Sequence, residues 1–155
     1  MLRKSLLVFL LVLVIIQFFR PQKNVSAQDQ PQALKKRYAI PANVEASLQQ
    51  ACYDCHSNNT RYPWYAQVQP VAWYLADHVK EGKEELNFDE FLSYPPRKQD
   101  HKLEEVIETQ EEGTMPISSY TALHKNANLT PKQKREIIDW VKVTRKEINY
   151  QGEEK

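Results

Sequence analysis

The fold is decided by residues 43–56, which read Asn-Val-Glu-Ala-Ser-Leu-Gln-Gln-Ala-Cys-Tyr-Asp-Cys-His. Four side chains recur along this stretch at intervals of four, four and three residues: Val44, Leu48, Cys52 and Cys55. Residues at these intervals lie on one face of an α-helix, and asparagine is a preferred helix N-cap. The stretch therefore predicts a helix capped by Asn43, whose apolar face ends in two cysteines followed directly by His56.

The scarcity of glycine predicts an all-α fold for the whole chain. Its 155 residues include three glycines, whereas a β-sandwich or barrel would need glycine at many tight turns. This length allows one compact domain plus a leader. Further helices are expected over residues 70–82 and 99–112, and another after Thr130, which precedes a proline and can form a capping box with Gln133. Trp140 is expected to pack near the N-terminal helix of the domain.

The charge distribution argues against a nucleic-acid-binding protein. The formal net charge is +1, but residues 1–27 contain four basic side chains and no acidic one, so the remainder of the chain is net acidic. Phosphate backbones are bound by clustered Lys and Arg. The sequence has no basic stripe of this kind, and no nucleic-acid partner is expected.

Residues 1–27 have the pattern of an export signal. A basic tip precedes an apolar run over residues 6–19, and small residues follow at Val25-Ser26-Ala27. The small residues offer a cleavage site, but the apolar run could instead remain as a membrane anchor, although 14 residues are fewer than the ~20 that span a bilayer core. Either outcome places the domain outside the cytoplasm, in the periplasm.

The segment after the leader is expected to be a tether without fixed structure. Residues 20–37 are rich in Gln, Lys and Pro and contain almost no large apolar side chain. The predicted organisation is therefore a leader over residues 1–27, a tether over residues 28–37 and a helical domain over residues 38–150.

Cys52, Cys55 and His56 form a C-x-x-C-H motif and include the only two cysteines of the chain. Thiols three residues apart on a helical turn project to one side, so both can form thioethers with the two vinyl groups of one porphyrin. The imidazole that follows can then coordinate the iron. The motif predicts one covalently attached haem c with His56 as the proximal ligand.

Three other readings of the cysteines have weaker support. A disulfide would close so short a loop that it restrains the unfolded chain little. A thioredoxin-like redox pair needs a βαβ context, which the flanking sequence lacks. A zinc site needs four ligands, and no second Cys or His cluster lies at a suitable spacing.

Met115 is the predicted sixth ligand of the iron. It is the only methionine besides Met1, and its thioether is a soft donor that favours ferrous iron. Gly113 can end the preceding helix and Pro116 stiffens the loop after the methionine. The alternative is that Met115 only fills a gap in the core.

His78 is the rival for the sixth position. It shares a helical stripe with Val71, Tyr74 and Leu75, so it is expected to face inward, where a single histidine is more often a hydrogen-bonded core residue than a ligand. His101 and His124 lie in polar surroundings, and no role is expected for them.

Aromatic residues are concentrated over residues 61–65 and at Trp73 and Tyr74. They could pack against a porphyrin edge, with Arg61 paired to a propionate. They could equally form the core of a small helical domain. The sequence leaves both possibilities open.

Several stretches resemble a known family, the small haem-binding domains with mono-haem c-type cytochrome character that occur in bacterial envelope proteins. The resemblance covers residues 38–146 and is carried by residues 52–60, 62–65, 78–82 and 86–88, by Met115-Pro116, and by Leu129-Thr130 before Trp140. It implies a helical fold around one haem with His56 and Met115 as axial ligands, as in class I cytochromes c. His78 and Asn87 belong to the resemblance, but it assigns them no role.

The expected function is single-electron transfer outside the cytoplasm, without enzyme activity. The expected partners are redox proteins, a haem-attachment machinery and possible contact with the membrane through residues 6–19. The alternative is a haem-based sensor or peroxidase-type protein whose distal ligand is labile or is His78.

Overall fold

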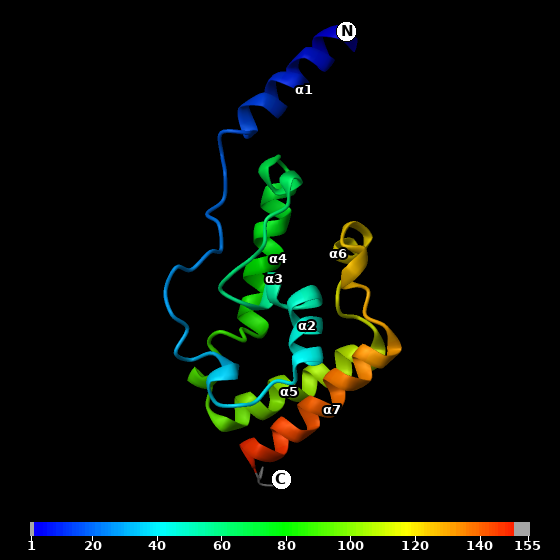
Figure 1. Ribbon diagram of the computed structural model, residues 1–155. Coiled ribbons are helices and arrows are strands. Elements are labelled where there is room, and N and C mark those ends of the chain that lie inside the picture. Colours follow the sequence, from blue (N-terminus) through cyan, green and yellow to red (C-terminus); the bar gives the residue numbers. More distant parts are fainter. Residues whose placement is uncertain (1, 151–155) are drawn as a thin grey trace, which may run out of the picture.

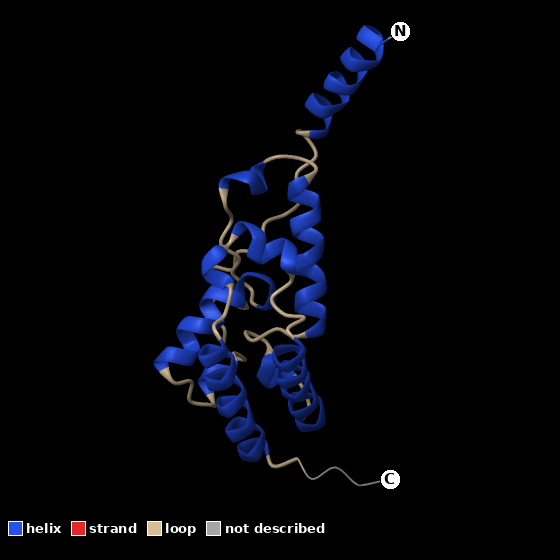
Figure 2. Cartoon of the chain, turned by 90° about the vertical axis from the view of Figure 1, so that its right-hand side faces the viewer, coloured by secondary structure: helices blue, strands red, loops and turns tan. Residues whose placement is uncertain are grey.

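The computed structural model describes residues 2–150, so that residue 1 of the predicted leader lies outside the described part. Within that part the fold is all-α, as predicted, and no strand is present (Figures 1 and 2). The α-helices are α1 (Leu2–Ile16), α2 (Ala42–Ala51), α3 (Tyr53–His56), α4 (Val71–Glu85), α5 (Pro96–Glu112), α6 (Ser118–Leu123) and α7 (Pro131–Ile148). Short 3₁₀ turns are η1 (Leu34–Lys36), η2 (Trp64–Gln67), η3 (Phe91–Ser93) and η4 (Lys125–Ala127).

The core lies where α2 meets the paired helices α5 and α7, which run side by side at the base of the molecule (Figure 1). Its largest fully buried apolar side chains come from all three helices, from η1 and from η3: Leu34, Leu48, Phe91, Leu103, Ile137 and Val141. Their burial removes apolar surface from water, at about 1.5–3 kcal/mol for each fully buried side chain. This base supports α3 and α4 above it.

The start of α7 confirms the predicted capping box. Thr130 Oγ1 accepts a hydrogen bond from the backbone N–H of Gln133, and Gln133 Oε1 accepts one from the N–H of Thr130 at 2.9 Å. Further along α7, Trp140 is buried and donates from Nε1 to the carbonyl of Ala39 at 3.0 Å. Trp140 therefore fixes the chain just before α2, which agrees with its expected position.

The start of α2 differs from the prediction by two residues. Pro41 is the N-cap and the helix begins at Ala42, so Asn43 lies in the first turn with its side chain exposed. Proline locks φ near −65° and directs the chain into the helix at the next residue, which makes an asparagine cap unnecessary. The predicted face is confirmed, because Val44 and Leu48 are buried.

The expected tether is instead a strap, residues 17–36, that lies along the domain. Asn24 is its central contact: its Nδ2 donates to the carbonyl of Ser57 at 2.8 Å and to Thr60 Oγ1 at 2.9 Å. Its Oδ1 accepts from Lys83 Nζ at 2.8 Å. The strap thus binds the loop that follows α3 and the helix α4.

The prediction of a loose segment over residues 28–37 was wrong. Leu34 is buried in the core beside Ala33, and its N–H donates to the carbonyl of Phe88 at 2.8 Å. A single leucine was overlooked because composition averages over the whole segment, whereas one fully buried side chain is enough to fix the chain.

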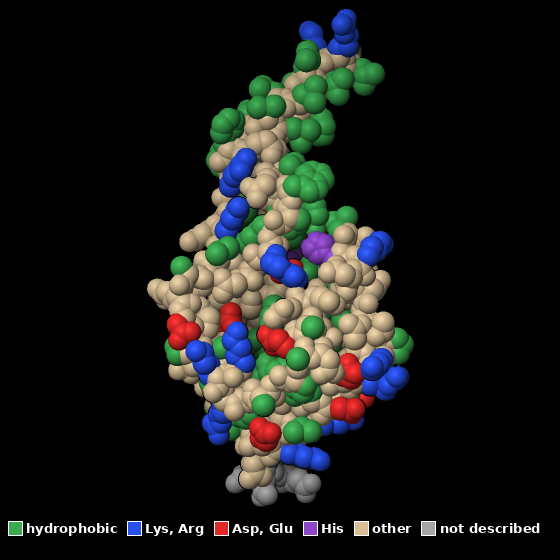
Figure 3. Space-filling view, viewed as in Figure 1, with side chains coloured by type: hydrophobic (Ala, Val, Ile, Leu, Met, Phe, Trp, Pro, Cys, Tyr) green, Lys and Arg blue, Asp and Glu red, His purple; other side chains and the backbone are tan. Residues whose placement is uncertain are grey.

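Helix α1 stands away from the other helices, and its apolar side chains are exposed (Figures 1 and 3). Residues just after it contact the domain: Gln17 Oε1 accepts from the N–H of Gln69 at 3.0 Å, and the carbonyl of Phe19 accepts from Trp73 Nε1 at 2.8 Å. Within residues 2–150, no helix combines the length and the apolar character required to cross a membrane.

Candidate functional site

The C-x-x-C-H motif lies at a break between two helices. Helix α2 ends at Ala51, Cys52 takes φ −121°, and α3 follows as one turn. The N–H groups of Cys55 and His56 both donate to the carbonyl of Cys52, at 3.1 and 3.0 Å. Both thiols are free and half-buried. The break therefore places the two cysteines and the histidine on one turn.

The surroundings of the thiols do not favour thiol–disulfide chemistry. Burial raises the pKa of Cys52 to about 12, and burial together with the neighbouring Asp54 raises the pKa of Cys55 to about 11. Redox-active cysteines have a lowered pKa. The zinc reading has no support either, because in the described part of the chain no three His, Cys, Asp or Glu side chains converge as a metal site.

The ring of His56 is oriented by α4 and the loop after it. Its Nδ1 lies 2.9 Å from the carbonyl oxygen of Leu86, which assigns the proton to Nδ1 and leaves the Nε2 lone pair available. Burial also lowers the pKa of His56, which favours the neutral imidazole that a metal requires.

Helix α4 approaches α3 closely because residue 82 is glycine. A Cβ atom built on Gly82 would lie 2.9 Å from the backbone oxygen of Cys55 and 3.1 Å from its Cβ. Real Cβ atoms do not come so close to a backbone oxygen. Gly82 therefore lets α4 pack directly on the motif, which brings Leu86 within reach of His56.

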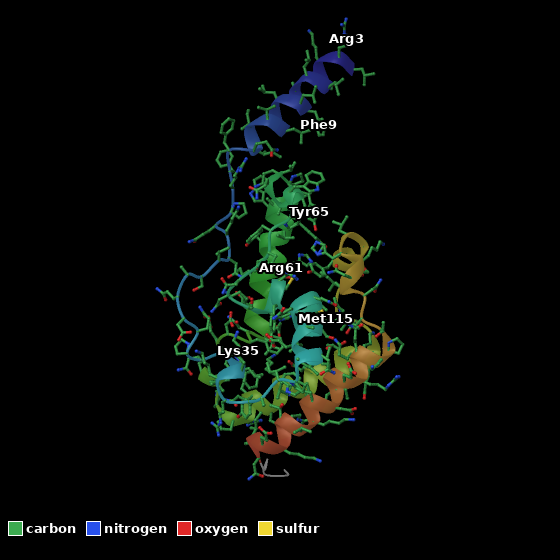
Figure 4. All side chains as sticks on the ribbon, in the orientation of Figure 1. Arg3, Phe9, Lys35, Arg61, Tyr65 and Met115 are labelled. Carbon is green, nitrogen blue, oxygen red and sulfur yellow. The ribbon has the colours of Figure 1, made fainter. Side chains whose placement is uncertain are left out.

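Two adjoining cavities, of about 320 and about 410 Å³, open beside the motif. Five residues line both cavities: Ala51, His56, Glu85, Met115 and Pro116. Cys52 lines only the smaller cavity and Cys55 only the larger one. Figure 4 shows Met115 beside α2. The structure thus brings all four predicted site residues to these two adjoining cavities.

The residues around these cavities fit a haem group. Volumes of about 300–1,000 Å³ are usual for cofactor sites, and the donor set of two thiols, an imidazole and a thioether matches haem chemistry. The smaller cavity has an apolar wall made of Leu48, Leu86, Phe88, Val106 and Ile137. Polar residues also line this cavity, and the buried Oε1 of one of them, Gln110, has no hydrogen-bond partner within residues 2–150.

Met115 lies on a loop that begins where predicted. Gly113 takes φ +72° and ends α5, and glycine adopts this left-handed conformation without strain. The side chain of Met115 remains 37% exposed, so it is not the buried gap-filler that the alternative reading required. Its role as an iron ligand stays a prediction.

The predicted inward face of α4 was wrong. The core-facing residues are Ala72 and Val79, whereas Val71 and Tyr74 are exposed and His78 is half-buried. The small side chain at position 72 allows close packing that the larger stripe does not, so the helix is rotated away from the expected orientation.

His78 lines the larger cavity together with Met115 and remains a rival ligand by position. Its Nδ1 lies 2.9 Å from the carbonyl oxygen of Tyr74, and its ring centroid lies 4.1 Å from that of Tyr74. His101 is exposed and pairs with Glu105 at 3.3 Å, an ordinary surface contact as expected.

Asp54 is the main functional residue that the sequence analysis missed. It stands between the two cysteines, is 6% exposed, and accepts hydrogen bonds from Arg61 Nε at 3.0 Å and from Tyr120 Oη at 2.6 Å. Arg61, for which pairing with a propionate was one of two open readings, is paired with Asp54. A carboxylate on the buried side of a helix needs a partner, and this signal could have identified Asp54.

The aromatic stretch divides between surface and cavity. Trp64 is 80% exposed, so it belongs to no core. Tyr65, by contrast, lines a third cavity of about 70 Å³ with Tyr120 and His124, and its hydroxyl bonds His124 Nε2. His124, to which no role had been given, is thus part of an aromatic cluster beside the larger cavity.

Asn87 receives a role that the resemblance had left open. It is buried, and its Nδ2 donates to Asn58 Oδ1 at 2.9 Å while its Oδ1 accepts from the N–H of Asp89 at 3.0 Å. Asn87 therefore ties the segment after α4 to the loop that follows the C-x-x-C-H motif.

The sequence was compared with known proteins. It matches a family model described as the haem-binding domain over residues 11–143, which is most of the chain and includes all residues of the site. No curated protein and no solved structure matches the chain. The match begins within α1 and therefore includes the strap.

Proposed function

Because the chain belongs to the haem-binding domain family, we propose that it is a mono-haem c-type cytochrome that transfers single electrons outside the cytoplasm. One observation carries this proposal. Cys52 and Cys55 line two adjoining cavities that share His56 and Met115. Two thiols, an imidazole and a thioether are the side chains that covalent attachment of a haem and two protein ligands to its iron would require.

The roles of the four residues follow from their chemistry. Cys52 and Cys55 hold the haem through thioether bonds, and His56 binds the iron through Nε2 while Leu86 fixes its ring. Met115 supplies the second axial ligand, a thioether that favours ferrous iron and raises the reduction potential. When bound, the haem supplies a one-electron iron couple.

The charges that line the cavities support an electron carrier whose redox partner is basic. Apolar residues of the smaller cavity, such as Phe88 and Ile137, exclude water from one side. Acidic side chains lie among the lining residues of both cavities: Glu81, Glu85, Glu105, Glu108 and Glu112. A redox partner with a positive docking face would be steered to this edge and bound briefly.

The leader and the thiols together suggest the route of maturation. Residues 1–27 have the pattern of an export signal, and both thiols must be reduced when they meet the haem. We therefore include a separate haem-attachment machinery among the partners, with the periplasm as the compartment. Contact between residues 6–19 and the membrane also belongs to this proposal.

The second candidate function is a ligand-binding sensor or peroxidase-type haem protein. It is favoured by the 37% exposure of Met115 and by the position of His78 in the same cavity. Carbon monoxide added to the ferrous protein separates the two functions, because rapid and complete binding at neutral pH would show a labile or absent methionine ligand.

Denaturation of the exported protein in pyridine tests the cytochrome proposal. Thioether-linked haem stays with the chain and gives a c-type spectrum, whereas loss of all colour on extraction overturns covalent attachment. The oxidised spectrum then tests Met115, since methionine-ligated ferric haem has a weak near-infrared sulfur-to-iron band. Cys52→Ala serves as the matched variant and should weaken or abolish attachment.

A further inference from the structure

We propose that the hydrogen bond between Asp54 and Tyr120 is a latch that holds the Met115 loop, residues 113–124, against the C-x-x-C-H turn. This inference rests on the proposed function, because the latch matters for keeping Met115 in place as the sixth ligand. Asp54 and Tyr120 are positioning residues: they act through the loop and not on the iron.

The Asp54 side of the latch is fixed independently of the loop. Its Oδ1 accepts from the backbone N–H and from Nε of Arg61, both at 3.0 Å, and its Oδ2 accepts from Arg61 Nη2 at 3.1 Å. The guanidinium of Arg61 also bonds the carbonyl of Gln49, on α2. Arg61 therefore orients the carboxylate, whose Oδ2 is turned toward the loop.

The Tyr120 side belongs to α6, five residues beyond Met115. None of the residues of α6 is buried, so the hydrophobic core does not hold this helix in place. Its contact with the rest of the site is polar: Tyr120 Oη donates to Asp54 Oδ2 at 2.6 Å. The ring of Tyr120 also packs edge-on against His124, with centroids 4.1 Å apart, and His124 meets the hydroxyl of Tyr65. Figure 4 shows Tyr65 beside the upper part of α4, on the side where α6 lies.

The hydrogen bonds of Met115 itself are long. The N–H of Met115 lies 3.5 Å from the carbonyl oxygen of Thr109, and Gln110 Nε2 lies 3.3 Å from the carbonyl oxygen of Met115. Most N–H···O bonds in proteins are near 2.9–3.0 Å. Side-chain hydrogen bonds to Asp54, Tyr65 and Tyr74 tie the rest of the loop to other elements, and the bond from Tyr120 to Asp54 is the one that reaches the C-x-x-C-H turn.

Removing the latch should let the loop open more often. The acceptor is a carboxylate oxygen at 2.6 Å, and losing a hydrogen bond of this kind shifts an equilibrium by about 10-fold. In the ferrous protein the sixth position would then be accessible to an external ligand for a larger fraction of the time. The observed rate of carbon monoxide binding rises in the same proportion.

The decisive comparison uses the holoprotein and two tyrosine variants. Tyr120→Phe removes the latch hydroxyl. Tyr74→Phe removes an exposed hydroxyl of α4 that lies 3.2 Å from Oγ of Ser119, the neighbour of Tyr120 on α6. Tyr120→Phe is expected to bind carbon monoxide about 10-fold faster, to weaken the sulfur-to-iron band and to lower the potential. Tyr74→Phe should match the unchanged protein in all three. Equal carbon monoxide rates in both variants would overturn the latch.

A second measurement separates failure of the latch from failure of the proposed function. Hydrogen exchange of the holoprotein should speed up over residues 116–124 in Tyr120→Phe and stay unchanged over residues 96–112. If the unchanged protein lacks the sulfur-to-iron band but Tyr120→Phe still loosens residues 116–124, the Met115 assignment fails and the latch holds. If exchange over residues 116–124 does not change, the latch fails whatever the ligand.

Discussion

The two sides of the cavities are held in different ways. On the His56 side, the segment over residues 52–60 is bound by the strap through Asn24, by α4 through the close approach at Gly82, and by the loop over residues 86–89. On the Met115 side, the loop over residues 113–124 has a helix without a buried residue, long hydrogen bonds at Met115, and side-chain hydrogen bonds to Asp54, Tyr65 and Tyr74.

Under the proposed function, haem attachment depends on the first side and the position of the sixth ligand on the second. A segment that is fixed by contacts from three directions keeps its geometry when any one of them is lost. A loop held by a few side-chain hydrogen bonds can change its position when one of them is lost. Under the proposed function, the ligand on the second side could therefore be adjusted without disturbing the side that would attach the haem.

The largest effect is expected from Gly82→Ala, which alters the packing on the His56 side of the cavities. The new Cβ would lie 2.9 Å from the backbone oxygen of Cys55, so α4 must move away from α3, at about 1–3 kcal/mol of unfolding free energy. Haem per chain should fall as well. Urea unfolding and pyridine spectra measure both quantities.

Gly113→Ala is the matched control for this change. An alanine at position 113 would be strained at φ +72°, so about 1–2 kcal/mol of unfolding free energy should be lost. The nearest atom to its Cβ, however, is the flexible end of Lys134 at 3.6 Å. Its haem content should stay that of the unchanged protein. Equal haem content in both glycine variants would contradict the distinction between the two sides.

Met115→Ala removes the thioether on the other side of the cavities, and the covalently attached haem should remain in place. Loss of the thioether is expected to lower the reduction potential by an amount on the order of 0.1 V, within the ~0.8 V range that axial ligands set. A redox titration measures the shift. Leu123→Ala, an exposed change on the same loop, is the control. An unchanged potential in Met115→Ala would show that the ligand is another residue.

Asn24→Ala tests the contribution of the strap to the His56 side. The change removes hydrogen bonds to Ser57, Thr60 and Lys83, and about 1–2 kcal/mol of unfolding free energy should be lost. Urea unfolding is the measurement, and the exposed Gln28→Ala is the control, expected within about 0.5 kcal/mol of the unchanged protein. If the two variants are equally stable, the strap contributes nothing.

The smallest effect is expected from Lys102→Met. Lys102 Nζ joins α4 to α5 through Glu85 at 2.9 Å and Glu105 at 2.8 Å, but the side chain of Glu85 is 75% exposed. The loss should stay below about 1 kcal/mol and shrink further at about 1 M salt. The test compares the urea midpoints of Lys102→Met and of the exposed variant Lys142→Met at low and at high salt. A larger loss that resists salt would mean that the pair is structurally essential.

Local signals predicted the parts of the fold that depend on neighbouring residues. The capping box at Thr130 and the end of α5 at Gly113 each follow from a few consecutive residues, whereas the all-α class follows from the scarcity of glycine in the whole chain. The motif likewise identified Cys52, Cys55 and His56 as a group, and the structure places Met115 on the same cavities.

Contacts between distant residues could not be predicted in this way. The strap depends on Asn24 meeting Ser57, and the latch on Asp54 meeting Tyr120, pairs 33 and 66 residues apart. The face of α4 was mispredicted because the apolar stripe at Tyr74 and His78 lines cavities instead of the core. Helical periodicity shows that residues share a face, but not which neighbour that face meets.

The strap has a mechanical consequence. Gln17 and Phe19 are bonded to Gln69 and Trp73, and Asn24 is bonded to Ser57, directly after His56. A pulling force applied through α1 would act first on these hydrogen bonds. Through Asn24 it would act on Ser57, next to His56, before it acted on α5 and α7. Tension on α1 would thus be transmitted to His56, so the strap couples the N-terminal helix to the site as well as supporting it.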